Sequence, residues 1–203
     1  MIFQSKSLLA TTAIVGCSIT SSLFDTADAH GYLKTPRSRN WYAYEEAVWW
    51  DVKDTDPLQE SDPYSANRGG TAAQCGIIID RNYDLPKNAK DGGLLKPVIQ
   101  ECYEEGSVID VEVTLTAYHG GHFEFHACPI SWGEVPTEAC FKAHPLEFVE
   151  DVLHGAPKDP NYPTRAYIHG LSQMSFGNFH YKYKLPAGLL GELVLIQWYY
   201  VTG

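Results

Sequence analysis

The sequence carries too little positive charge for a protein that binds nucleic acid or an anionic membrane. It has 15 Lys and Arg against 25 Asp and Glu, giving a net charge of −10, and no basic stretch is longer than a dipeptide. Contacts with phosphates or anionic lipids need a positive surface, because they release counterions or neutralise lipid charge. We therefore expect neither nucleic acid nor a membrane as a partner of the folded domain.

Several short motifs are also missing. There is no Cys-x-x-Cys pair, which argues against a cysteine-based zinc site, and no His-Glu-x-x-His, which argues against a zinc hydrolase. No Asn-x-Ser/Thr sequon occurs, so N-glycosylation is not expected. The chain has no internal repeat, and its 44% hydrophobic and 20% charged residues are ordinary for one globular domain.

The first 29 residues are typical of a secretory signal peptide. Lys6 precedes an apolar stretch at residues 8–23, and the segment ends in an Ala-Asp-Ala cleavage pattern at residues 27–29. The apolar run is shorter than the roughly 18 to 20 residues that span a bilayer, so we expect cleavage rather than a membrane anchor. This predicts a secreted, extracellular domain of residues 30–203 that begins with His30.

Four cysteines remain once the signal segment is removed: Cys75, Cys102, Cys128 and Cys140. An even number of cysteines behind a signal peptide predicts two disulfides. Three connectivities are possible. The sequential one, which joins Cys75 to Cys102 and Cys128 to Cys140, is favoured because it closes the shortest loops.

Alternating hydrophobic residues predict two strands around a pair of glycines. Apolar residues occupy every second position from residue 109 to residue 115, which is typical of a half-buried strand. After Gly120-Gly121 the alternation resumes over residues 122–128, with Phe123 and Phe125 on one face. We expect the two runs to pair as an antiparallel hairpin.

The rest of the chain predicts further strands joined by long loops. Residues 179–185 alternate, and residues 193–200 form an apolar run typical of a strand buried on both faces. Residues 30–105 and 129–177 are rich in Pro and Gly and are predicted to be mostly loops, with one short helix at residues 147–154. The pattern predicts an all-β fold, an immunoglobulin-like or fibronectin-III-like antiparallel β-sandwich with disulfide-stapled loops.

A histidine at a mature N-terminus offers two nitrogen donors, its α-amino group and its ring. Together with a second imidazole, His30 would supply three nitrogens in a T shape, which suits tetragonal Cu(II). Three histidines near the glycine pair, His119, His122 and His126, are candidates for the second imidazole. The alternative is that most of these histidines are half-exposed strand residues.

Four sequence blocks, in order, resemble one family across the whole mature chain. They are HGYL with PRSRN at residues 30–40, QCG at 74–76, HGGHFEF running into ACP at 119–129, and LIQWYY at 195–200. Together they are similar to the lytic polysaccharide monooxygenase superfamily, especially the members once described as chitin-binding type-4 domains.

The resemblance implies a copper-dependent enzyme with a histidine brace. His30 carries the amino group and one imidazole, and His119 carries the third nitrogen, so both are expected to be metal-binding and catalytic. An external electron donor reduces the one copper ion, and oxygen or hydrogen peroxide is the co-substrate. Glu124, on the same strand face as His122, is a candidate to hydrogen-bond the oxygen species, and the favoured alternative is an outward-facing, solvated carboxylate. His122 is expected to play a supporting or structural role.

The implied partner is a polysaccharide such as chitin, cellulose or another cell-wall glycan, whose glycosidic bonds are cleaved by oxidation. We expect a monomer with Tyr32, Tyr42 and Tyr44 stacking on sugar rings. The tryptophans of the same region are expected to pack in the core, because large indoles usually bury. They are Trp41, Trp49 and Trp50.

One feature of the family is not matched. Its members place a Phe or Tyr beside copper from a segment that follows the Trp strand, whereas this sequence stops at Gly203. We therefore expect the domain to lack its C-terminal strand, with Tyr199 or Tyr200 as possible substitutes. Two alternatives of the same fold stay open: a non-catalytic carbohydrate-binding module and an extracellular copper-trafficking protein.

Overall fold

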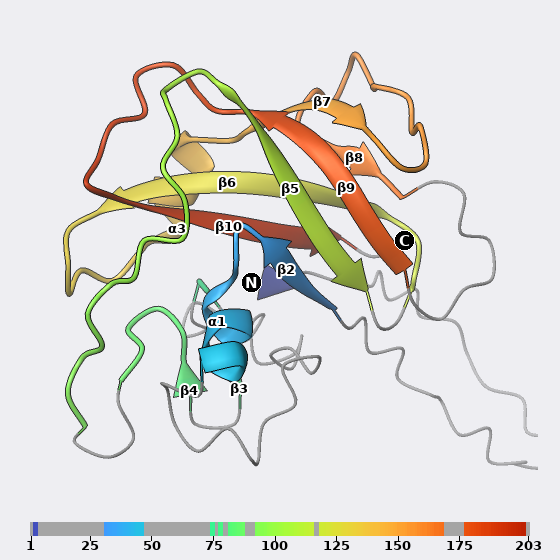
Figure 1. Ribbon diagram of the computed structural model, residues 1–203. Helices are drawn as coiled ribbons and strands as arrows, with labels where there is room; N and C mark the ends of the chain where they lie inside the picture. Colours follow the sequence, from blue (N-terminus) through green and yellow to red (C-terminus); the bar gives the residue numbers. More distant parts are fainter. Residues whose placement is uncertain are drawn as a thin grey trace, which may run out of the picture.

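Two facing β-sheets form the framework of the described chain (Figure 1). The computed structural model describes residues 2–3, 31–46, 74–75, 77–78, 81–87, 92–115, 118–168 and 177–201, without the side chains of residues 2, 3, 43, 44, 77, 78, 81 and 82. Sheet A has the order β1-β10-β6-β8, with bounds Ile2–Phe3, Leu193–Val201, His122–Ile130 and Ala166–Tyr167. Sheet B has the order β2-β5-β9-β7, with bounds Gly31–Thr35, Val108–Leu115, Gly177–Lys184 and Glu147–Asp151. The all-β sandwich is confirmed.

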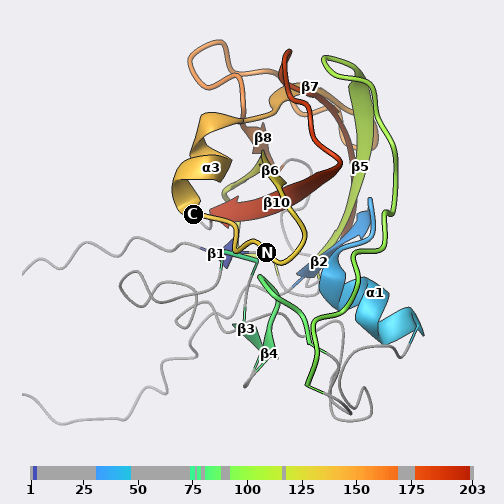
Figure 2. The same ribbon diagram turned by 90° about the vertical axis from the view of Figure 1, so that its left-hand side faces the viewer.

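The smaller elements lie at the sides of the sandwich. Strands β3 (Ile77–Ile78) and β4 (Arg81–Asn82) form a separate two-stranded sheet. Figure 2 shows helix α3 (Glu138–Ala143) on the side of sheet A and helix α1 (Arg39–Glu46) on the side of β2. None of the helices in the described ranges is long and apolar enough to cross a membrane.

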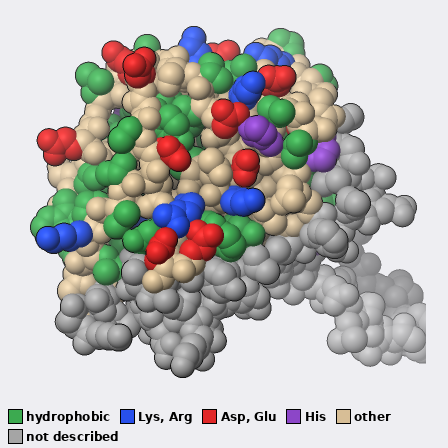
Figure 3. Space-filling view, viewed as in Figure 1, with side chains coloured by type: hydrophobic (Ala, Val, Ile, Leu, Met, Phe, Trp, Pro, Cys, Tyr) green, Lys and Arg blue, Asp and Glu red, His purple; other side chains and the backbone are tan. Residues whose placement is uncertain are grey.

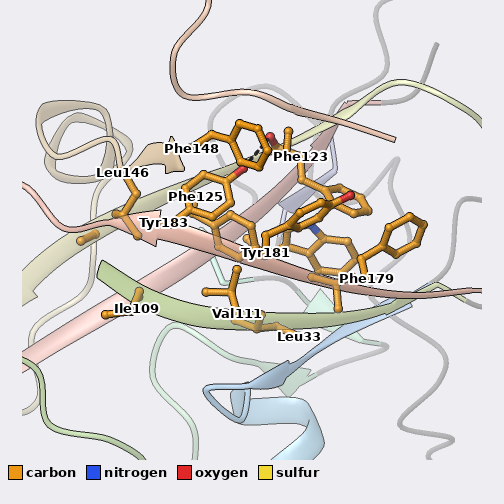
Figure 4. Close-up of a cluster of buried hydrophobic side chains, with 14 of the residues drawn as sticks. Leu33, Ile109, Val111, Phe123, Phe125, Leu146, Phe148, Phe179, Tyr181 and Tyr183 are labelled. Carbon is orange, nitrogen blue, oxygen red and sulfur yellow. Dashed lines mark hydrogen bonds between the residues drawn. The ribbon is translucent and has the colours of Figure 1, made fainter. Parts of the chain in front are cut away.

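Aromatic and aliphatic side chains fill the space between the sheets (Figure 4). The ring of Phe123 makes edge contacts with four other buried aromatic rings, at centroid distances of 5.0 to 5.9 Å. They are Phe179, Tyr181, Trp198 and Tyr200. In β10 the fully buried residues are Gln197, Trp198 and Tyr200, so the prediction of a strand buried on both faces holds only toward its C-terminal end.

The predicted hairpin of β5 and β6 is wrong, although both strands exist. β5 pairs with β2 and β9 in sheet B, while β6 pairs with β10 and β8 in sheet A. The connection between them crosses from one sheet to the other. Alternation cannot distinguish these cases, because an apolar face is buried equally well against a core shared by two sheets.

The predicted helix at residues 147–154 is also wrong. Residues Glu147–Asp151 form β7, which pairs with β9 and buries Phe148 against the core. A helix forms instead at α3, in a segment predicted as loop. Its N-cap is Thr137, whose side chain accepts a hydrogen bond of 3.2 Å from the backbone N–H of Cys140.

One of the two predicted disulfides is present. Cys128 and Cys140 are joined and connect α3 to β6, whereas Cys75 and Cys102 are not joined to each other. A short loop between two cysteines does not by itself place their sulfur atoms in bonding geometry. Cys102 is exposed, and burial raises the pKa of the Cys75 thiol to about 11, which disfavours the thiolate that disulfide formation requires.

Candidate active site

β2 begins at Gly31, which is packed into the end of the sandwich. Gly31 pairs with Leu115, the last residue of β5. A Cβ on Gly31 would lie 2.5 Å from the carbonyl oxygen of Thr114, 2.8 Å from the Leu115 side chain and 3.0 Å from the indole of Trp198. The first of these contacts is with backbone, which cannot swing aside, so only glycine fits here. The chain therefore enters β2 pressed against both sheets.

His119 lies in the connection between β5 and β6, and hydrogen bonds fix this connection where it meets β6. The Tyr200 hydroxyl donates to the carbonyl oxygen of Gly120 at 2.9 Å and accepts from the backbone N–H of His119 at 3.1 Å. The backbone N–H of Ile168 donates to the carbonyl oxygen of Gly121 at 3.1 Å. We call residues 118–121 the His119 loop.

Trp198 and Tyr200 lie two residues apart on the core face of β10, and they connect these two features. Their rings are stacked, with centroids 6.1 Å apart and planes within 9° of each other. Trp198 lies against Gly31, while Tyr200 holds the backbone of His119. The start of β2 and the His119 loop therefore rest on the same pair of rings.

Four charged or titratable side chains, which we call the outer-face cluster, lie on the outer face of sheet A: His122, Glu124, His126 and Arg165. His122 Nε2 donates to Glu124 Oε1 at 3.2 Å, and Arg165 Nε donates to the same oxygen at 2.9 Å. His126 Nε2 lies 3.6 Å from the other carboxylate oxygen. The Glu124 carboxylate is thus bound by cationic and imidazole groups and is not a solvated surface charge.

The pKa values in this cluster follow from these contacts. The hydrogen bond from His122, assisted by the one from Arg165, lowers the pKa of the Glu124 carboxyl, so this group stays ionised. Burial lowers the pKa of His126, which favours its neutral ring. His126 Nδ1 is buried and has no hydrogen-bond partner among the residues that the structure describes.

Residues 30–203 match the family described as lytic polysaccharide mono-oxygenase, cellulose-degrading. The chain belongs to this family. Its fold is similar to that of the lytic polysaccharide monooxygenase AA15 from Thermobia domestica, solved in the Cu(I) state, with a TM-score of 0.55 and 24% identity over 86% of this chain and 84% of that chain. No curated protein matches the chain significantly.

Lytic polysaccharide monooxygenases are copper-dependent, act on polysaccharides and are typically secreted, so we asked whether these residues fit copper. No three His, Cys, Asp or Glu side chains within the described ranges could hold a metal ion together, and this includes the outer-face cluster. This absence does not test a histidine brace, because His30, one of its two histidines, lies outside the described residues. The tight fit of Gly31 is compatible with a metal ligand at the preceding residue, and three nitrogen donors suit Cu(II).

The other described histidines of the chain have local structural contacts. His144 Nδ1 lies 3.0 Å from the carbonyl oxygen of Cys140, and His154 Nε2 lies 3.0 Å from that of Asn178. His180 Nε2 lies 2.7 Å from Asp110 Oδ1 on the outer face of sheet B. His169 falls outside the described residues.

The predicted sugar-stacking tyrosines differ in their surroundings. Tyr32 is only 7% exposed, and its ring stacks on Trp41 at a centroid distance of 4.4 Å, so Tyr32 does not offer a ring face to a sugar. Trp41, expected in the core, is the more exposed of the pair. Tyr42 is half-buried, with the Arg37 guanidinium 5.0 Å from its ring centroid. The side chain of Tyr44, like the residues Trp49 and Trp50, lies outside what the structure describes.

Three features of the candidate site were not predicted from the sequence. They are the steric need for Gly31, the two hydrogen bonds of the Tyr200 hydroxyl and the pairing of Arg165 with Glu124. Alternation along β10 does place Trp198 and Tyr200 on one face. The partners of these residues come from distant parts of the chain, and no local pattern predicts them.

Proposed function

We propose that this chain is a secreted enzyme that uses one copper ion to cleave the glycosidic bonds of a polysaccharide oxidatively. The amino group and imidazole of His30 and the imidazole of His119 hold the copper as a histidine brace. The observation that carries this proposal is that Gly31 lies against the indole of Trp198, the His119 loop is held by the hydroxyl of Tyr200, and these two rings stack on each other. Since consecutive Cα atoms lie about 3.8 Å apart, this arrangement supports a shared site for both histidines.

When bound, copper supplies the one-electron chemistry that passes reducing equivalents from an external donor to oxygen or hydrogen peroxide and so oxidises carbon beside a glycosidic bond. The protein supplies nitrogen donors in a fixed arrangement. The α-amino group of a free N-terminus has a pKa of about 7.7 to 8.0, so releasing its proton costs little at neutral pH. Removal of Met1–Ala29 creates this amino group, which links secretion to the completion of the site. It also removes β1, so β10 becomes an edge strand of sheet A in the mature chain.

The surface supports a neutral glycan as substrate. Figure 3 shows acidic and basic side chains interspersed over the face that it views. On sheet B, Lys34 pairs with Glu112 and Lys182 pairs with Glu150. A surface of mixed sign does not select a highly charged polymer. We propose chitin, cellulose or another neutral cell-wall glycan, with Trp41, Tyr42 and Tyr44 as candidate stacking residues.

For Glu124, hydrogen bonding to the oxygen species stays a prediction. Its carboxylate already accepts hydrogen bonds from His122 and Arg165. It lies on the outer face of β6, whereas the backbone of His119 is held from the core face. The role therefore requires Glu124 to exchange one of these partners for the oxygen species.

The test compares the mature chain that begins at His30 with a chain that retains Ala29. Retaining Ala29 converts the amino group of His30 into an amide and leaves every other side chain in place. We expect the mature chain to bind one Cu(II) in a calorimetric titration and to release oxidised oligosaccharides from cellulose or chitin with ascorbate, detected by mass spectrometry. The extended chain should do neither, and equal copper affinity in the two chains would contradict the brace.

The same experiment separates the two alternatives. Binding of the mature chain to an insoluble glycan, without oxidised products in the presence of copper and reductant, would indicate a carbohydrate-binding module. Tight copper binding without affinity for any glycan in the panel would indicate a copper-trafficking protein.

A further inference from the structure

The hydroxyl of Tyr200 uses both of its hydrogen-bonding functions on the His119 loop. It donates to the carbonyl oxygen of Gly120 and accepts from the backbone N–H of His119. Its ring is fully buried and packs against Phe123 and Trp198, at centroid distances of 5.0 and 6.1 Å. A phenol held this firmly fixes the two peptide groups that it contacts.

The loop needs such support because of its own backbone. Gly120 and Gly121 have φ angles of 66° and 84°. Residues with L side chains rarely adopt positive φ, whereas glycine adopts positive and negative φ about equally. Glycine loses more conformational entropy on ordering than any other residue. Without contacts from outside, the position of His119 beside two such residues would be poorly defined.

We propose that Tyr200 is a positioning residue for the copper site: its hydroxyl clamps the backbone of His119 so that the imidazole is in place before copper arrives. This inference rests on the proposed function, because it takes His119 as a copper ligand. Groups that orient metal ligands typically affect metal affinity by about 10- to 100-fold when they are removed.

Another tyrosine of the core, Tyr183, makes the role of Tyr200 specific. Tyr183 is equally buried, and its hydroxyl also donates to backbone carbonyls, those of Phe123 at 3.3 Å and Thr164 at 3.5 Å. Neither of these groups belongs to the His119 loop. Tyr183 is therefore a matched control for the general effect of losing a buried tyrosine hydroxyl.

Protonation is compatible with the clamp. A phenol has an ordinary pKa of about 10, so it keeps its proton at physiological pH. It can then donate to the carbonyl of Gly120 and accept from His119 at the same time. A phenolate would lose the first of these bonds.

The experiment compares Tyr200→Phe with Tyr183→Phe in the mature chain. In the metal-free protein, amide hydrogen exchange of His119 should be about 10-fold faster or more in Tyr200→Phe and unchanged in Tyr183→Phe, because only the first variant removes the acceptor. Cu(II) affinity should fall by about 10- to 100-fold in Tyr200→Phe, with an altered Cu(II) electron paramagnetic resonance spectrum. Tyr183→Phe should keep the wild-type affinity and spectrum.

Equal exchange rates and copper affinities in the two variants would overturn the clamp. If Tyr200→Phe does not fold, 3-fluorotyrosine in place of Tyr200 keeps the hydroxyl and makes it a weaker acceptor. An intermediate exchange rate at His119 then supports the clamp, and an unchanged rate overturns it.

The wild-type protein and His119→Ala separate this inference from the proposed function. If the wild type binds copper no more tightly than His119→Ala, then His119 is not a ligand and both proposals fail. If the wild type binds tightly, His119→Ala does not, and Tyr200→Phe equals Tyr183→Phe, then only the clamp fails.

Discussion

The two faces of β6 and β10 carry opposite kinds of chemistry, although they belong to the same strands. On the core face, uncharged aromatic rings surround Tyr200, whose hydroxyl is hydrogen-bonded to backbone groups of the His119 loop. On the outer face, Glu124 is neutralised by Arg165 and lies between His122 and His126. The side chains on the core face do not bind metals, yet they order the backbone of the proposed ligand. Residue type alone therefore says little about where a metal is held.

The strongest test of this comparison replaces two histidines separately. They are His119, whose backbone is held from the core face, and His126, which lies on the outer face. His119→Ala should weaken Cu(II) binding by about 1,000-fold or more, equal to about 4 kcal/mol, because one of three nitrogen donors is lost. His126→Ala should change the affinity by less than about threefold. Calorimetric titration of both variants measures the two effects, and the comparison breaks if His126→Ala proves the more damaging.

Removing one ring from the core face should cost most of the stability that a small domain has. Phe123→Ala leaves a cavity between the sheets and should lower the free energy of unfolding by about 3 to 5 kcal/mol. On the outer side of the same strand, His122→Ala should cost less, on the order of 1 to 2 kcal/mol, through its hydrogen bond to Glu124. Urea denaturation of both variants provides the measurement, and equal costs would remove the distinction between the faces.

The outer-face cluster should also make the stability of the protein depend on pH. The folded pKa of Glu124 lies below the unfolded value of about 4.3, so its stabilisation is complete above about pH 4.3 and is lost as the pH falls through the lower folded pKa. At pH 7 we expect Glu124→Gln to be less stable than the wild type by about 1 to 3 kcal/mol.

Glu112→Gln is the control for this effect. Glu112 lies 3.9 Å from Lys34 Nζ in a largely exposed pair, which should contribute less than about 1 kcal/mol. Urea denaturation between pH 3 and 7 should show a pH-dependent loss for Glu124→Gln that is absent for Glu112→Gln. Parallel pH profiles would mean that the outer-face cluster does not stabilise the ionised carboxylate.

The smallest effect is expected at Tyr181. Its hydroxyl is buried and has no hydrogen-bond partner within the described part of the chain, so Tyr181→Phe should change stability by less than about 0.5 kcal/mol or raise it slightly. Tyr183→Phe, which loses two backbone partners, should cost about 1 kcal/mol. Thermal unfolding of both variants would compare them, and a larger loss at Tyr181 would reveal a partner for its hydroxyl.

The long strands of the fold could be predicted from the sequence, but their pairing could not. Alternation located β5, β6 and β9, since a period of two depends only on neighbouring residues, and an apolar run located β10. The sheet to which each strand belongs depends on contacts far along the chain, and this is why β5 and β6 were expected to pair. Short elements such as α3 and β7 were missed or misassigned because five or six residues carry little periodic signal.

For the candidate site, the ligands stay a prediction and the supporting contacts could not be predicted. Sequence blocks that resemble the family led us to expect His30 and His119 as ligands. The indole of Trp198 against Gly31, the hydroxyl of Tyr200 on His119 and the guanidinium of Arg165 on Glu124 all depend on how distant segments pack. Tyr32 illustrates the same limit, because its burial under Trp41 is set by α1 and not by its own neighbours in sequence.

The crowding around Gly31 has a consequence for anyone who varies this protein in a library. Any side chain at position 31 must displace the backbone of Thr114. Selection of folded variants from a library should therefore recover only glycine at this position. An added Cβ at Gly120 would meet nothing within 4 Å, and the limit there is its positive φ alone. Asn and Asp enter that region readily, so position 120 should accept both and offers a place to adjust the His119 loop by selection.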